Sequence, residues 1–95
     1  MSYNIDMQNL KRWIVVFRAL ANINRLKIIK ILSNSHRMSV TDISIELKIS
    51  FKATSNHLAI LRSLDVLEPQ GTEGHVLYSI NSSMPKDFRT AINLM

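Results

Sequence analysis

Two helix-start signals lie close together in the middle of this 95-residue chain and constrain its fold more than any other feature. The first is SVTD at residues 39–42, where the Ser39 hydroxyl can accept from the Asp42 amide and the Asp42 carboxylate can accept from the Ser39 amide. The second is Ser50, a predicted N-cap for the stretch FKATSNHLAILRSL. Lys48 and Ile49 form a tight connection between the two helices. This spacing predicts a helix-turn-helix over about residues 39–65.

Two further helices are predicted before this unit. The segment 7–20 carries Met7, Leu10, Ile14 and Phe17 at helical spacing. Its centre, from Trp13 to Phe17, is apolar at five consecutive positions, so the helix has two apolar faces and needs two partners. A second helix is predicted to begin after the N-cap Asn22 and to fade near residues 33–35.

The pattern changes period after Asp65. Residues 66–80 predict two short strands around a glycine-containing turn, with Val76, Tyr78 and Ile80 alternating on one face. A last helix is predicted over about residues 84–95. The expected architecture is therefore mainly α with a small β-hairpin. It is a single winged helix-turn-helix domain over residues 1–95, in the order helix, helix, helix, helix, strand, strand, helix.

Composition narrows the function. The net charge is +5, and seven of the twelve basic residues lie in residues 1–37 together with a single acid, so a polyanionic partner is expected. The chain has no cysteine, which excludes disulfides and thiolate metal sites. No apolar run approaches the roughly 18 residues that span a bilayer, and a cytoplasmic location is expected.

The fourth predicted helix offers candidates for reading DNA bases. Its predicted inward stripe is Thr54, Leu58, Leu61 and Leu64 or its neighbour. The outward face then has mostly small polar groups and one long cation, and is made of Phe51, Lys52, Ser55 and Asn56. Asn56 suits bidentate contact with adenine, Lys52 suits guanine or phosphate, and Ser55 suits either. Phe51 fits a thymine methyl group and fits a partly buried hydrophobic staple equally well.

Phosphate contacts are expected from a second group. The wing segment 69–76 contains Glu73 and no Lys or Arg, which leaves Gln70, Thr72 and His75 as neutral donors. Phosphate anchoring then falls to Arg37, Lys48, Lys52 and the helix N-termini at Ser39 and Ser50.

Metal binding and catalysis find no support in the sequence. Three scattered histidines without cysteine or acidic companions do not form a zinc site, and no nucleophile is paired with a base. We expect no metal, no cofactor and no enzymatic activity. His57 is expected to be packed and hydrogen-bonded, and Arg25 to form a structural ion pair within the domain.

Three segments resemble the ArsR family of transcriptional regulators: ALANINRLKIIKIL at 19–32, SNHLAILRSLDVL at 55–67, and Tyr78-Ser79-Ile80. The resemblance implies a homodimer, paired through the helices at 7–20 and 84–95, that represses transcription from a palindromic operator. The apolar faces of those helices supply the predicted dimer residues Leu10, Trp13, Ile14, Phe17, Phe88 and Ile92.

The resemblance also has a limit. The family's Cys-x-Cys-Asp metal motif corresponds here to residues 39–42, without thiols, and the last helix offers Asp87 but no histidine. The chain therefore resembles the metal-independent, autorepressor-like members. The alternative from another class is a winged-helix module that binds a protein through its acidic wing and Phe51.

Overall fold

The computed structural model describes residues 4–71 and 74–95. Along these residues the elements are α1 (Met7–Leu20), α2 (Ile23–Ser35), β1 (Met38–Ser39), α3 (Val40–Leu47), α4 (Phe51–Ser63), β2 (Leu67–Gln70), β3 (Leu77–Ile80) and α5 (Lys86–Ile92). The predicted order of helices and of the hairpin is confirmed. The two-residue strand β1 was not predicted.

The three strands form a small antiparallel sheet in the order β1-β3-β2. Leu67 lies opposite Ile80 and Gln70 lies opposite Leu77, which is the expected hairpin, while Met38 of β1 lies opposite Tyr78. The predicted alternation holds for Tyr78 and Ile80, which pack against the core, whereas Val76 precedes β3 and is 36% exposed. Ser79 is the buried residue of that strand. Ser79 lies on the central strand, and its small side chain fits against the packed helices.

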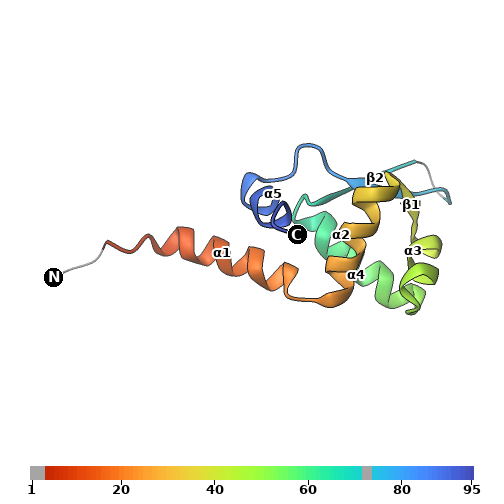
Figure 1. The fold of residues 1–95 in the computed structure, drawn as a ribbon, viewed down its shortest axis with the longest axis horizontal. Helices are drawn as coiled ribbons and strands as arrows, with labels where there is room; N and C mark the ends of the chain where they lie inside the picture. Colours follow the sequence, from red (N-terminus) through yellow and green to blue (C-terminus); the bar gives the residue numbers. More distant parts are fainter. Residues whose placement is uncertain (1–3, 72–73) are drawn as a thin grey trace.

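A shared hydrophobic core joins all five helices to the hairpin. Its buried members are Val16, Ala19, Ile28, Ile29, Leu32, Ile43, Leu47, Leu58, Leu61, Val66, Leu67, Met84 and Phe88. The inward stripe predicted for α4 is confirmed at Thr54, Leu58 and Leu61, which are fully buried. Helices α2, α3 and α4 pack against one another with the sheet beside them, which is the winged helix-turn-helix arrangement (Figure 1).

Helix α1 extends from this body as an arm (Figure 1). The chain measures 57 × 24 × 22 Å along its principal axes, and α1 runs along the longest of them. Only Val16 and Ala19 of α1 are buried, whereas Leu10, Ile14 and Phe17 are exposed. The two apolar faces predicted for this helix are therefore present, and among the described residues only one of them is covered.

Helix α5 is shorter than the predicted span of 84–95. Pro85 has ψ 143°, an extended value, and is the N-cap, so the helix begins at Lys86. It ends at Ile92, with Asn93 as its C-cap.

In the part of the chain that the structure describes, no helix has both the length and the apolar character needed to cross a membrane.

Candidate nucleic-acid interface

Helix α4 is fixed by caps and a tight turn. The Ser39 hydroxyl accepts from the Asp42 amide at 3.1 Å, and the Ser50 hydroxyl accepts from the Ala53 amide at 3.0 Å. Between them Lys48 adopts the left-handed conformation with φ 59° and ends α3. The reciprocal half of the predicted capping box is not formed, since the Asp42 carboxylate makes no hydrogen bond to Ser39, which is paired in β1 opposite Leu77.

The outward face of α4 is open to solvent. Phe51, Lys52 and Asn56 are exposed, and Ser55 is half-buried beside them. Thr54 on the opposite side is fully buried, and its hydroxyl donates to the Ser50 carbonyl at 2.9 Å. The helix therefore cannot rotate without breaking its core contacts, so the polar side chains hold a fixed direction.

A basic side chain from outside the wing forms a hydrogen bond with a wing residue. Arg37, which lies between α2 and β1, donates from Nη1 to the Gln70 side chain at 2.9 Å. The wing residues 67–71 and 74–80 themselves contain no Lys or Arg. His75 is exposed on the wing, whereas Thr72 lies outside the described residues. Sequence reasoning placed Arg37 among the phosphate anchors but missed its position against the wing, because 33 residues separate Arg37 from Gln70.

A cavity of about 550 Å³ separates the wing from the helix-turn-helix. Ser39 and Phe51 line it on one side, and Pro69, Val76 and Tyr78 on the other. Phe51 lines this cavity and is 58% exposed, so much of its side chain remains open to solvent.

The predicted dimer residues divide into two groups. Leu10, Ile14 and Phe17 are exposed, Trp13 and Ile92 are half-buried, and the rings of Trp13 and Phe17 stack at 5.4 Å. Phe88 is different because it is fully buried within its own protomer. The prediction that Phe88 contacts a partner is therefore wrong. Its ring instead fills the core where α5 packs near α1.

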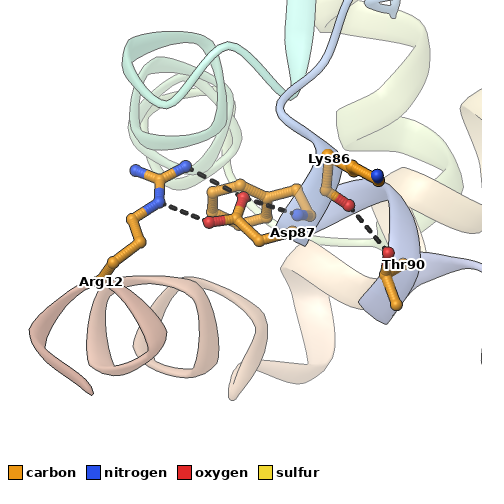
Figure 2. Close-up of polar contacts among 5 residues, drawn as sticks. Arg12, Lys86, Asp87 and Thr90 are labelled. Atoms are coloured by element: carbon orange, nitrogen blue, oxygen red, sulfur yellow. Dashed lines mark hydrogen bonds and ion pairs between the residues drawn. The ribbon is translucent and has the colours of Figure 1, made fainter. Parts of the chain in front are cut away.

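One ion pair links α1 to α5. Arg12 donates from Nε and Nη2 to the two carboxylate oxygens of Asp87, at 2.6 and 3.1 Å, as Figure 2 shows. The Arg12 guanidinium also lies 5.4 Å from the centre of the Phe88 ring. The hydrogen bond from Arg12 and a further one from the Phe88 amide hold the pKa of Asp87 below its ordinary value. No signal in the sequence pairs residues that are 75 positions apart.

Arg25 forms hydrogen bonds rather than the predicted ion pair. Its Nε donates to the Ala19 carbonyl at 2.6 Å and its Nη2 to the Arg18 carbonyl at 3.3 Å. Its Nη1 lies 3.3 Å from Nδ1 of His57 on α4. The partners are main-chain oxygens because α1 ends there and its last carbonyls have no partner within the helix. His57 is half-buried and hydrogen-bonded, as expected.

Metal ligands do not come together in residues 4–71 and 74–95. No group of three His, Cys, Asp or Glu side chains there is placed to hold an ion. His36 and His75 are exposed, and His57 faces Arg25.

Comparison with known proteins agrees with this geometry. The sequence pattern described as "Bacterial regulatory protein, arsR family" matches residues 22–68, from the N-cap of α2 into β2. No curated protein matches the chain. Among solved structures, the transcriptional regulator HlyU from Vibrio vulnificus CMCP6 is 30% identical with a TM-score of 0.72, covering 93% of this chain and 88% of that one.

Two further structures are similar. The transcriptional repressor PagR of Bacillus anthracis is 27% identical with a TM-score of 0.71, covering 94% of this chain and 98% of its own. The homodimeric winged helix-turn-helix DNA-binding domain of Mb0332 from Mycobacterium bovis, a possible ArsR-family regulator, has a TM-score of 0.74 at 24% identity. It covers 99% of this chain and 85% of that one, and at this identity it supports the fold alone.

Proposed function

This chain belongs to the ArsR family of bacterial regulatory proteins, and from that premise we propose that it is a cytoplasmic homodimeric repressor that binds an inverted-repeat operator. The family's fold is that of DNA-binding transcriptional regulators. The observation that carries the proposal is the outward face of α4, where Lys52 and Asn56 are exposed on a helix fixed by its caps and core. The proposal includes no enzymatic step and no cofactor.

Base contacts are assigned to the exposed turns of α4. Asn56 presents an amide for bidentate contact with adenine, and Lys52 presents one cation to guanine or phosphate. Ser55 lies between them with a hydroxyl that can donate or accept. Phe51 has enough exposed ring to pack on a thymine methyl group.

Phosphate contacts surround this face. Lys48, Arg37 and the N-termini of α3 and α4, at Ser39 and Ser50, supply positive charge or free amides. Thr72 and His75 of the wing add neutral donors. Arg37 compensates in part for the missing basic residues of the wing, since its guanidinium lies against Gln70.

The dimer is assigned to the exposed face of α1, made of Leu10, Ile14 and Phe17 with Trp13 and Ile92 at its edge. The Mb0332 domain, which has a similar fold, is homodimeric. A twofold axis would place two α4 helices about 34 to 36 Å apart, one turn of DNA, which requires an inverted repeat.

Repression is proposed because PagR, with 27% identity, is a transcriptional repressor, and a bound dimer blocks promoter DNA. We assign no thiolate metal-sensing site, because the chain has no cysteine and residues 39–42 replace both thiols of the family motif.

Selection of bound duplexes from random DNA, with and without metal ions, followed by fluorescence anisotropy on the selected operator, tests the proposal. Lys52→Ala and Asn56→Ala should each weaken binding by about 1 to 3 kcal/mol. Lys86→Ala is the matched control, since it removes an exposed cation on α5 outside the helix-turn-helix. Selection that enriches no inverted repeat would contradict the proposal.

The alternative is a module that binds a protein, favoured by the 58% exposure of Phe51 beside the wing cavity. It predicts that Lys52→Ala and Asn56→Ala leave DNA affinity no different from that of Lys86→Ala.

A further inference from the structure

We propose that Arg25 is a positioning residue that couples the end of α1 to α4, and that this coupling operates only while His57 is neutral. Acidification should therefore weaken DNA binding. The inference rests on the proposed function, because it assigns a role to α4 in binding an operator.

The geometry gives one guanidinium three partners in two other helices. Arg25 stands in the first turn of α2, where the Asn22 side chain caps its amide at 3.1 Å. From there it reaches the Arg18 and Ala19 carbonyls at the end of α1 and Nδ1 of His57 in α4. All three guanidinium nitrogens are used, so the Arg25 side chain links its own helix α2 to the two helices α1 and α4.

Hydrogen-bond chemistry fixes the state of His57. A guanidinium only donates, and it does not lose its proton in proteins. Nδ1 of His57 must therefore accept, and the ring carries its proton on Nε2. A proton added to Nδ1 would face the Nη1 hydrogen, so protonation of His57 and the bond to Arg25 exclude each other.

The surroundings of His57 favour the neutral ring. Burial and then the charge of Arg25 lower the pKa of His57. The elements that pack most closely against α4 are α2, α3 and β2, whose charged residues are Arg25, Lys27, Lys30, Asp42, Glu46 and Glu68. Among the described residues, Arg25 is the one whose charge acts on this ring. Within residues 4–71 and 74–95, no carboxylate raises the pKa of this ring.

The link joins the two surfaces on which the proposed function depends. His57 directly follows Asn56, the proposed adenine contact, so a change in how α4 is held moves that amide. At the other end, Arg18 directly follows Phe17, whose exposed ring belongs to the proposed dimer face. Arg25 thus sets the position of the base-reading helix relative to the helix that pairs the protomers.

The experiment compares four variants with the wild type by anisotropy on the selected operator between pH 5.5 and 8. Wild-type affinity should fall by about threefold to tenfold in acid, the range of one net hydrogen bond. His57→Asn places an amide oxygen near the position of Nδ1 without a titrating group, so it should bind well and lose the acid effect. Arg25→Met should bind about threefold to tenfold more weakly at pH 8 and show little pH dependence. His36→Asn, at an exposed histidine, should match the wild type. Arg25→Lys should bind more tightly than Arg25→Met but more weakly than the wild type, because an ammonium group lacks the planar set of guanidinium N–H donors.

NMR titration of the His57 ring tests the hydrogen bond to Arg25 in the absence of DNA. The His57 ring should show the Nε2–H tautomer, and its pKa should rise in Arg25→Met. An unchanged His57 titration in that variant, an acid effect that persists in His57→Asn, or tighter binding of the wild type in acid would each overturn the inference. If the wild-type protein selects no operator, the proposed function is wrong. The ring titration still decides whether Arg25 and His57 are hydrogen-bonded.

Discussion

Replacing Phe17 by alanine tests the proposed dimer surface. The Phe17 ring is 61% exposed in the single chain and stacks on Trp13, so it is ordered without being buried. Burying a whole phenylalanine side chain contributes about 1.5 to 3 kcal/mol, and the exposed share is about 1 to 1.8 kcal/mol per protomer. A twofold dimer loses this contribution twice, about 2 to 3.6 kcal/mol, which corresponds to roughly a 30-fold to 400-fold weaker dimer.

Sedimentation equilibrium measures this dissociation constant directly. Ile45→Ala is the matched control, because Ile45 on α3 is 69% exposed but lies off the α1 face. We expect the control to dimerise as the wild type does, and urea denaturation of both variants at low concentration checks that the protomers stay folded. Equal dissociation constants for Phe17→Ala and Ile45→Ala, or a wild type that sediments only at 10.9 kDa at micromolar concentration, would refute the assignment.

Three further changes test the protomer. Phe88→Ala should destabilise it by about 3 to 5 kcal/mol in urea denaturation, because the ring is fully buried, and a loss confined to dimerisation would contradict that placement. Ser50→Ala removes the cap of α4 and should cost about 1 kcal/mol on the same measurement, with Ser63→Ala, at an exposed serine in the last turn, as the control. The pKa of Asp87 is lowered by Arg12, so the pair stabilises the fold above the ordinary aspartate pKa near 4 and is lost as pH falls below it. Asp87→Asn should therefore reduce the loss of unfolding free energy between neutral and acid pH by at most about 1 kcal/mol, since Arg12 is 41% exposed. A pH dependence of the unfolding free energy equal to that of the wild type would show that the pair has no effect.

Local signals in the sequence predicted most of the fold because the signals and their partners are close in the chain. Ser39 and Ser50 accept from amides three residues ahead, and Lys48 makes the turn between them. The buried stripe of α4 follows from helical spacing alone. The outward face of Lys52 and Asn56 then follows from that stripe.

Most of the failures involve partners far apart in the chain. Strand β1 has only two residues, and its existence depends on pairing with β3, which lies nearly forty residues later. Phe88 has the spacing of an interface residue, and only the packing of α5 shows that its own core takes the ring. Arg25 was expected to pair with a carboxylate. It donates instead to main-chain carbonyl oxygens at the end of α1, and composition does not predict which acceptors lie near this side chain.

The long arm of α1 has a thermodynamic consequence for assembly. Beyond Arg12, toward the N-terminus, Met7 and Leu10 are exposed in the single chain, and this end of the helix has little tertiary packing to support it. Short helical segments without such packing are marginal in water. Part of the association free energy then goes into ordering these turns, so calorimetry should find a larger enthalpy and a more negative heat-capacity change than the apolar area of the dimer face alone provides.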